Sequence, residues 1–329
     1  MCGIVGYVGK QQAAPILLEG LSKLEYRGYD SAGIAVLADG KISVSKTRGR
    51  LKNLYDMIDG GNAVSGTLGI GHTRWATHGE PSDVNAHPHL SKSGKFAVVH
   101  NGIIENYIPL KKKLAEKGFE FVSETDTEVV AHLFEYYYKG DLIDAMSQVI
   151  NHVEGSYALG IICDDYPDRF VAVKKASPMI VGLGDGENFI ASDVTAILKY
   201  TKNVYYLEDD EIVMLSKDGV KVYNPFDKEE IKKEMFTVDW DISTAEKGGY
   251  EHFMMKEIED QPKALKDTIS PRIKDGKVVL DNFSLDEDQI KKLKKIHIVA
   301  CGSAYHVGVV GKYVIEKLTR IPVEVEVAS

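Results

Sequence analysis

A cysteine stands at the second position of the chain, in the opening stretch Met1-Cys2-Gly3-Ile4-Val5-Gly6. Removal of the initiator methionine would give this residue a free α-amine beside its thiol. The thiolate is the reactive form of cysteine, and an α-amine, with a reference pKa near ~8, can accept a proton close to neutrality. One residue would then supply both nucleophile and base, as in N-terminal threonine nucleophiles. The alternative is that Cys2 is merely a small residue beside the start.

A dense group of functional side chains occupies His72-Thr73-Arg74-Trp75-Ala76-Thr77-His78-Gly79-Glu80-Pro81, after a short apolar run. Arg74 offers a planar fork of N–H donors that suits two-point recognition of a carboxylate. The alternative is that Arg74 and Trp75 only pack on the surface of a loop. The stretch has too many functional side chains for an ordinary turn, so it is a candidate substrate-binding loop.

Two further stretches carry polar groups that suit the same chemistry. An apolar run enters Asn101-Gly102, which is typical of a tight turn, but the Asn101 amide and the Gly102 N–H could instead face a developing oxyanion. Ser123-Glu124-Thr125-Asp126 precedes a helical pattern. It is either a helix N-cap with acidic first-turn residues, or it presents Asp126 to a substrate ammonium group.

The histidines of the first hundred residues invite a metal hypothesis, but only His87-Pro88-His89 is tightly spaced. Neither an HExxH helix nor a carboxylate-rich companion is present. We therefore expect no metal site and interpret most of these side chains as hydrogen-bonded loop histidines. They are His72, His78, His87, His89 and His100.

Length and composition limit the class of protein. The chain has 329 residues, which favours one large or two medium domains, and its 44% hydrophobic and 27% charged residues are ordinary for a soluble globular protein. A formal charge of -9 argues against nucleic acid as the main partner. No apolar run is long enough for a membrane span, and no signal peptide is evident. Three separated cysteines without CxxC spacing fit a reducing cytoplasm.

The elements that must position these groups are strands gathered around a few helices. A strand over 4–8 precedes a helix with leucines at helical spacing over 17–24. Asp39-Gly40 between two apolar runs predicts a β-hairpin. We expect further strands over 69–73, 96–100, 119–122, 157–163, 170–173, 179–182 and 188–191, and helices over 108–117, 127–138 and 141–153. The pattern favours an α+β fold of layered antiparallel sheets with helices outside.

The composition of the chain changes after about residue 223, where a charged run and Lys247-Gly248-Gly249 indicate a linker. A polar helix is predicted over 250–268, kinked or interrupted at Pro262. From Lys295 an apolar run, the turn Cys301-Gly302-Ser303 and a helical segment over 304–318 lead into alternating Val323-Glu324-Val325-Glu326-Val327. This is the start of a βαβ unit. One such unit cannot bury both faces of a parallel sheet, so we expect a truncated chain or a missing domain.

Several of these motifs, in the same order, closely resemble those of the glutamine–fructose-6-phosphate aminotransferase (glucosamine-6-phosphate synthase) family. The matching stretches are Met1–Gly6, Tyr26–Gly33, His72–Pro81, His100–Gly102 and Glu124–Asp126. The resemblance covers the whole chain and implies three parts. These are an N-terminal nucleophile glutaminase domain with an αββα sandwich over 2–217, a linker over 218–284, and the start of a flavodoxin-like sugar isomerase (SIS) domain over 285–329.

The resemblance also implies a role for each matching residue. Cys2 would attack the glutamine side-chain amide, with Asn101 and Gly102 as the oxyanion hole. Arg74 would bind the α-carboxylate of glutamine and Asp126 its α-ammonium group. The remaining glutamine contacts would come from the loop that closes over the substrate, through Trp75, Thr77 and His78. Support of these loops is expected from Arg27, His87 and His100.

Beyond glutamine, the resemblance implies ammonia transfer to fructose 6-phosphate, giving glucosamine 6-phosphate. Gly302 and Ser303 match the first sugar-phosphate loop, whereas Ala304 replaces a hydroxyl that many relatives carry there. No cofactor is implied, and a homodimer through the missing SIS domains is expected. One rival is another class II amidotransferase, such as the purine-pathway phosphoribosyl enzyme or asparagine synthetase. The other is a non-enzymatic SIS-type regulator that binds sugar phosphates.

Overall fold

The computed structural model describes residues 2–239, 250–280 and 285–328. The chain divides into two compact units, Met1–Gly248 and Gly249–Ser329. The three strands over 219–223, 230–231 and 236–237 belong to the sheets of the first unit. This division does not distinguish a separate linker, so the three predicted parts with boundaries at 217 and 284 stay a prediction.

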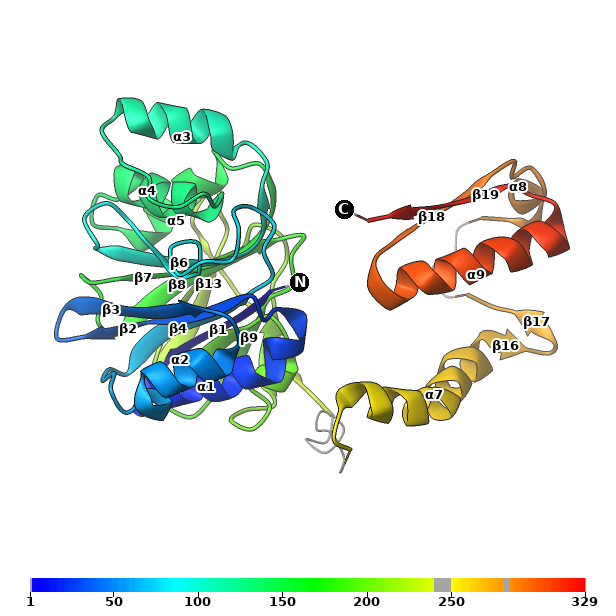
Figure 1. The fold of residues 1–329 in the computed structure, drawn as a ribbon, viewed down its shortest axis with the longest axis horizontal. Coiled ribbons are helices and arrows are strands. Elements are labelled where there is room, and N and C mark those ends of the chain that lie inside the picture. Colours follow the sequence, from blue (N-terminus) through cyan, green and yellow to red (C-terminus); the bar gives the residue numbers. More distant parts are fainter. Residues whose placement is uncertain (1, 240–249, 281–284, 329) are drawn as a thin grey trace. The chain divides into compact units, whose positions relative to one another are not determined.

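Two antiparallel sheets form the centre of the first unit (Figure 1). Among the described residues, one sheet has eight strands in the order β15 (Phe236–Thr237), β11 (Asn203–Tyr206), β9 (Ile180–Leu183), β10 (Asn188–Ala191), β1 (Gly3–Val8), β4 (Leu68–Arg74), β2 (Ser31–Ala38) and β3 (Lys41–Arg48). Over the same described residues, the other has seven, β14 (Glu230–Ile231), β13 (Gly219–Tyr223), β12 (Ile212–Ser216), β8 (Arg169–Lys175), β7 (Gly155–Cys163), β6 (Phe96–Ile104) and β5 (His89–Leu90).

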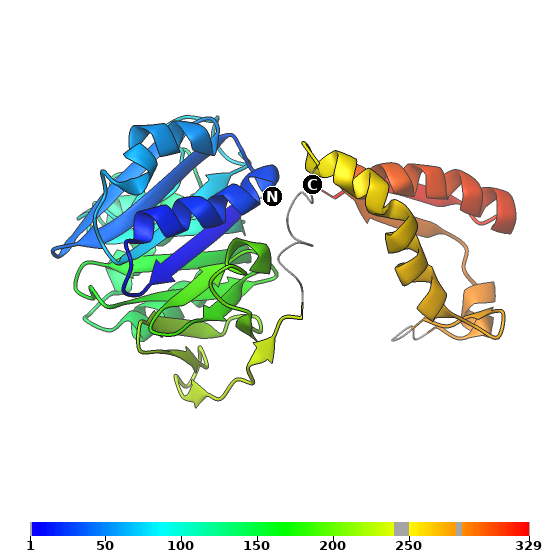
Figure 2. The same ribbon diagram turned by 90° about the horizontal axis from the view of Figure 1, so that it is seen from below.

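Helices cover the outer face of each sheet, which makes four layers (Figures 1 and 2). On the β1 sheet lie α1 (Ala13–Leu24) and α2 (Leu51–Met57), on the β6 sheet lie α4 (Thr127–Tyr137) and α5 (Leu142–Ile150), and α3 (Tyr107–Glu116) packs against α4. Short 3-10 turns occupy Glu25–Arg27, Asp59–Gly61 and Val194–Ala196. The fold of the first unit is therefore α+β with an αββα arrangement, as predicted.

Burial explains why the central strands are apolar on both faces. On β1, Ile4 joins the core between the two sheets, while the next residue, Val5, joins the core under α1. Alternate side chains of a strand point to opposite faces, and both faces of β1 are covered. Full burial of one such side chain contributes roughly 1.5–3 kcal/mol. The start of β1, and Cys2 with it, is thereby held in a rigid frame.

The predicted hairpin at Asp39-Gly40 is confirmed. β2 and β3 pair from Ser31↔Arg48 to Ala38↔Lys41, and both turn residues have positive φ, 50° and 69°. That conformation is what a two-residue type I′ turn requires.

The predicted strand over 119–122 is wrong, because this segment is a loop. The N–H groups of Val122 and Ser123 donate to the Glu128 carboxylate in the first turn of α4, at 2.9 and 2.7 Å. Phe121 packs edge-on against His132, with ring centroids 4.7 Å apart. The segment thus caps α4 instead of pairing with a strand.

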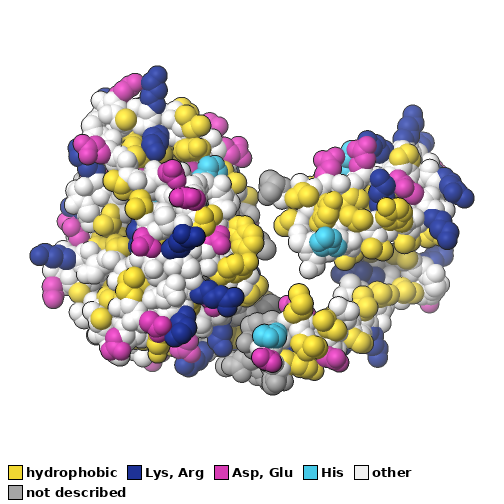
Figure 3. Space-filling view, in the orientation of Figure 1, with side chains coloured by type: hydrophobic (Ala, Val, Ile, Leu, Met, Phe, Trp, Pro, Cys, Tyr) yellow, Lys and Arg dark blue, Asp and Glu magenta, His cyan; other side chains and the backbone are white. Residues whose placement is uncertain are grey.

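The second unit contains α7 (Phe253–Ile269), a 3-10 turn (Ser270–Arg272), β16 (Ile273–Lys274), β17 (Lys277–Val278), α8 (Glu287–Lys291), β18 (Ile296–Ala300), α9 (Gly302–Thr319) and β19 (Val323–Val327). α7 continues through Pro262, so the predicted interruption does not occur. β18 and β19 are parallel and joined by α9, which confirms the predicted βαβ unit. Along α9, hydrophobic side chains gather on the surface (Figure 3), among them Val307, Val310, Tyr313 and Leu318.

Within the described residues, no helix combines the length and the apolar composition needed to cross a membrane.

Candidate active site

Cys2 lies at the start of β1, beside the end of β4. The register Gly3↔Thr73 between these strands brings it level with the residues after Thr73. The backbone N–H of Trp75 donates to Cys2 Sγ at 3.1 Å, and the thiol lies 3.4 Å from the Trp75 carbonyl oxygen. Burial raises the pKa of the Cys2 thiol, and the hydrogen bond with Trp75 acts in the opposite direction. Since the thiol is the resting form, a nucleophilic role requires a base.

Asn101 and Gly102 lie within strand β6, so the turn alternative is wrong. The Asn101 side-chain Nδ2 donates to the Cys2 carbonyl oxygen at 3.3 Å and to Ser192 Oγ at 2.8 Å. Gly102 has a φ of 123°, and a Cβ at this position would lie 2.0 Å from the Ser156 carbonyl oxygen. Only glycine fits this conformation. An amide N–H donor is therefore held next to Cys2 by irregular backbone inside a strand.

Arg74 is the last residue of β4 and is 3% exposed. Its Nη2 donates to the carbonyl oxygens of His78 and Gly79, the latter at 3.1 Å. Its Nη1 is buried and has no hydrogen-bond partner among the described residues. A buried charged group normally has a counter-charge, so the free edge of this guanidinium fits an anionic ligand.

Asp126 precedes α4 and is 4% exposed. Its carboxylate does not cap that helix. Instead, Oδ2 accepts a hydrogen bond from the Ile104 N–H at 2.7 Å and lies 4.0 Å from His100 Nδ1. This contact joins Asp126 to the end of β6, two residues after Gly102. The helix-cap alternative is therefore wrong for the Asp126 side chain.

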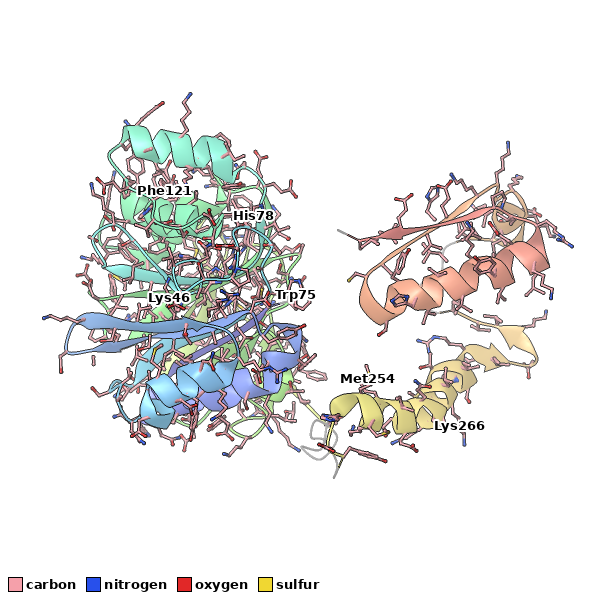
Figure 4. The ribbon with its side chains drawn as sticks, in the orientation of Figure 1. Lys46, Trp75, His78, Phe121, Met254 and Lys266 are labelled. Atoms are coloured by element: carbon pink, nitrogen blue, oxygen red, sulfur yellow. The ribbon has the colours of Figure 1, made fainter. Side chains whose placement is uncertain are left out.

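The loop after Arg74 borders this site and carries three of the predicted residues. Trp75 is 46% exposed and meets Tyr29 edge-on, with ring centroids 5.6 Å apart. Figure 4 labels Trp75 and His78, which lie on the same side of the first unit. His78 packs edge-on against Tyr107 at 5.2 Å, and Thr77 is exposed. None of the three is locked in the core, which suits residues that contact a ligand.

Arg27 lies outside this cluster and supports it. Its Nη2 contacts Asp193 Oδ2 at 2.5 Å, which ties the turn after α1 to the segment after β10. The next residue, Gly28, passes directly under the end of β4, where a Cβ would lie 2.7 Å from the Arg74 carbonyl carbon. Arg27 therefore lies next to the backbone that passes beneath Arg74, and its supporting role stays a prediction.

A chain of buried histidines lies behind Asn101. His72 contacts Asn101 and His87, while His87 and His100 both contact the Thr127 hydroxyl. The sequence interpretation of His72 as a hydrogen-bonded loop histidine is wrong about the loop, because His72 lies in β4. Nothing in its spacing indicates that it meets a residue 29 positions later. Burial lowers the pKa of His72 to about 3 and lowers the pKa of His87 and His100 as well. These imidazoles are neutral at physiological pH.

Among the described residues, two groups of side chains have metal-ligand spacing. They are Cys163 with Asp164 and Asp165, and His297 with Glu324 and Glu326. Neither group contains a residue of the site around Cys2. The histidine chain bonds to itself, to Thr127 and to Asn101 instead.

The buried histidines predict a loss of stability in mild acid. His72, His87, His89 and His100 all have lowered pKa values in the folded chain, mainly through burial. The unfolded chain binds protons first, below about pH 6.5, so the free energy of unfolding falls as the pH decreases. We expect a loss of about 1 kcal/mol per histidine between pH 7 and pH 5.5. Urea unfolding at both pH values measures the free energy of unfolding. Equal free energies at the two pH values would contradict the prediction.

Gly302 and Ser303 lie in the second unit, at the junction of β18 and α9. Gly302 has a φ of 59° and begins the helix, and both residues are exposed. The segment is a strand–turn–helix junction, and the phosphate role of Gly302 and Ser303 stays a prediction.

Comparisons with known proteins agree with this geometry. A family model described as "Glutamine amidotransferase domain" matches residues 72–199. The glutamine–fructose-6-phosphate aminotransferase [isomerizing] of Caldanaerobacter subterraneus subsp. tengcongensis is 62% identical over 100% of this chain and 54% of its own length. The protein of the same name from Clostridium tetani is 59% identical with the same coverage. The chain thus spans about half the length of the curated relatives it matches.

Two solved structures share the fold. The allosteric regulatory enzyme of purine biosynthesis aligns with a TM-score of 0.61 and 27% identity, covering 68% of this chain and 49% of that one. Glutamine phosphoribosylpyrophosphate amidotransferase from B. subtilis aligns with a TM-score of 0.62 over 98% of this chain and 65% of its own. At 20% identity the latter shows the fold alone. Residues 72–199 thus match a glutamine amidotransferase domain, and the whole chain is similar to about half the length of the glutamine–fructose-6-phosphate aminotransferases.

Proposed function

We propose that the first unit hydrolyses L-glutamine to glutamate and ammonia through a thioester on Cys2. The observation that carries this proposal is the Nη1 of the buried Arg74, which has no partner in the described part of the chain and lies one residue from the backbone N–H that touches the Cys2 thiol. Because the two hydrogens of Nη2 are directed at the His78 and Gly79 carbonyl oxygens, the N–H groups of Nη1 bind the α-carboxylate of glutamine. Asp126 binds the α-ammonium group, and the side-chain amide then reaches Cys2.

The chemistry follows from the order of these groups. After methionine removal the Cys2 α-amine accepts the thiol proton, directly or through one water, and the thiolate attacks the amide carbon. The Asn101 amide and the Gly102 N–H stabilise the oxyanion that forms. The ammonium form of the α-amine returns its proton to the leaving nitrogen, which departs as ammonia. Water then attacks the thioester and releases glutamate, which restores the thiol.

The residues of the 75–78 loop hold the substrate in this pose. We assign Trp75, Thr77 and His78 to glutamine binding, with Trp75 also shielding the thioester and guiding ammonia. Arg27, His87 and His100 support the walls of the site. Exclusion of water by such a loop strengthens every hydrogen bond to the oxyanion.

For the whole protein we propose the reaction that its relatives' names describe, transfer of the ammonia to fructose 6-phosphate to give glucosamine 6-phosphate. Gly302 and Ser303 would contact the sugar phosphate in an SIS domain that begins with β18. The exposed apolar side chains of α9 support a larger domain around this βαβ unit. A homodimer through SIS domains and a location in the cytoplasm complete this proposal. Full-length protein that formed phosphoribosylamine, and no glucosamine 6-phosphate, would refute the substrate assignment.

Glutamate release from L-glutamine by this chain tests the proposal directly. We expect steady turnover with equal amounts of glutamate and ammonia. A chain that binds sugar phosphates but releases no glutamate would favour the regulator alternative.

The Arg74 fork predicts a specific defect in substrate binding. Arg74→Lys keeps the charge but loses the planar pair of donors. We expect the KM for glutamine to rise about 10–100-fold, because a lysine cannot direct donors at the His78 and Gly79 carbonyl oxygens and at the carboxylate together, while kcat changes less. Steady-state kinetics measure both constants. Arg169→Lys is the matched control. Arg169 lies on β8, a different strand from that of Arg74, and contacts its sequence neighbour Asp168. An unchanged KM in Arg74→Lys would refute the carboxylate role.

A further inference from the structure

The amide of Asn101 must present its NH₂ end to Cys2, and the structure reveals what holds it that way. The Cys2 carbonyl oxygen, 3.3 Å from Nδ2, only accepts hydrogen bonds. Ser192 Oγ, at 2.8 Å, could serve either end of the amide. On the other side, Asn101 Oδ1 lies 3.0 Å from His72 Nε2. The imidazole therefore faces the oxygen end of the amide.

The protonation of His72 follows from a second contact. His72 Nε2 also lies 2.9 Å from the His100 carbonyl oxygen, which is an obligate acceptor. Nε2 must then carry the hydrogen, and a flipped Asn101 would direct its NH₂ group at another N–H. The Nε2–H form of His72 thus excludes the wrong orientation of the amide.

Further contacts at the other ring nitrogen of His72, Nδ1, favour the same tautomer. With Nε2 protonated, neutral His72 has a lone pair on Nδ1, which lies 3.1 Å from His87 Nδ1. His87 must donate there, so its Nε2 accepts from the Thr127 hydroxyl at 2.9 Å. The Thr127 oxygen in turn accepts from His100 Nδ1 at 2.9 Å. His100 ends the chain: its Nε2 faces the Ser156 carbonyl oxygen but makes no hydrogen bond of ordinary distance and angle among the described residues, so the polarity is set at the His72 end by the His100 carbonyl acceptor.

We propose that His72 is a positioning residue for Asn101, and that the chain His72–His87–Thr127–His100 fixes the His72 tautomer that directs the Asn101 donor at the oxyanion. All four side chains are 5% exposed or less, so water does not compete for these hydrogen bonds. The inference deepens the proposed glutaminase function and rests on it. It also explains why the imidazoles behind the site are neutral. A doubly protonated His72 would have no lone pair on Nδ1 to accept the hydrogen bond from His87 Nδ1.

Matched substitutions test the proposal by kinetics. His72→Phe keeps a ring but removes the Nε2 donor, whereas His72→Gln keeps an N–H donor. We expect His72→Phe to lower kcat about 10–100-fold with little change in KM, since a small displacement of a catalytic group has costs of this order. His72→Gln should recover most of kcat. Thr127→Val should lower kcat by about 3–10-fold, and Thr127→Ser should not.

A double-mutant cycle separates positioning from a general loss of structure. If His72 acts through Asn101, His72→Phe should have little further effect on kcat in the Asn101→Ala background. Equal losses in both backgrounds would overturn the proposal, as would an equal rise of KM and fall of kcat. Should His72→Phe fail to fold, the kcat values of Thr127→Val and Thr127→Ser test the proposal instead. Equal kcat values for these two variants would overturn it.

A measurement without catalysis keeps the inference distinct from the proposed function. Nitrogen-15 NMR of the full chain labelled at histidine reports the protonated nitrogen of each ring. We expect Nε2–H for His72 and Nδ1–H for His87 and His100, with His72 assigned from its missing signal in His72→Gln. Any other set of tautomers overturns the inference. Absence of glutamate release by the unsubstituted chain refutes the proposed function, whereas the tautomers still test the hydrogen-bond chain.

Discussion

Cys2→Ala should abolish glutamate release, with a loss of at least about 10⁴-fold in kcat, because removal of a covalent nucleophile leaves only binding and the oxyanion donors. Glutamine should still bind, since Arg74 and Asp126 are unchanged. A coupled assay for glutamate measures the rate, and isothermal calorimetry measures the binding.

The other cysteines supply the controls for this experiment. Cys163 is buried in the core, and burial raises its pKa to about 11, which makes it inert as a nucleophile. Cys301 is exposed in the second unit, so Cys301→Ala should leave glutamate release unchanged. Residual activity of Cys2→Ala within about tenfold of the unsubstituted chain would rule out the thioester mechanism.

Asn101→Ala should lower kcat about 10²–10³-fold and leave the KM for glutamine nearly unchanged, as expected when one oxyanion donor is lost. The side chain contacts Cys2, Ser192 and His72. These are not the residues assigned to the α-carboxylate and α-ammonium groups of glutamine. Its loss should therefore appear in the chemical step. Single-turnover formation of the thioester, followed by rapid quench, measures that step.

Asn62→Ala is a suitable control for the asparagine substitution. Asn62 is exposed, and its recorded side-chain contact is a 3.5 Å bond to Asp59. This variant should keep both constants. If Asn101→Ala raised the KM with an unchanged kcat, Asn101 would be a binding residue, and the oxyanion assignment would be wrong.

Local patterns in the sequence were sufficient to predict much of the fold. The Asp39-Gly40 turn, the strand that starts after Cys2 and the glycine that ends α3 all act through near neighbours in the chain. Gly118 has a φ of 86°, as a helix-ending glycine does, whereas α4 ends at Tyr137 with an extended Tyr138, before Gly140. Such signals are readable because their physical cause lies within a few residues.

The failures have three different causes: a side chain that caps a helix, strand pairing that overrides a turn composition, and a helix with few buried residues. The segment over 119–122 has the apolar residues of a strand, but its backbone donors bind the Glu128 carboxylate. Asn101-Gly102 has the composition of a turn, but its strand continues because β6 pairs with β7 from Phe96 to Ile104. Helix α2 was not predicted, and its buried residues are only Leu51 and Leu54, too few for a clear periodic pattern.

The site itself lies between these two cases. The types and order of Cys2, Arg74, Asn101 and Asp126 indicate glutamine chemistry through a resemblance. Their convergence depends on contacts across 73 residues for Cys2 and Trp75, and 99 for Cys2 and Asn101. The position of His72 in the site could not be predicted from the sequence, because it depends on a hydrogen bond to Asn101 in a strand of the other sheet.

The most direct test is mass spectrometry of the intact chain and its N-terminal peptide after treatment with a glutamine analogue that carries an electrophilic diazoketone in place of the side-chain amide. We predict that the active chain begins at Cys2 and gains one adduct, located on Cys2, with loss of glutamate release. Activity in a chain that retains Met1, or an adduct on Cys163 or Cys301, would contradict the N-terminal cysteine mechanism.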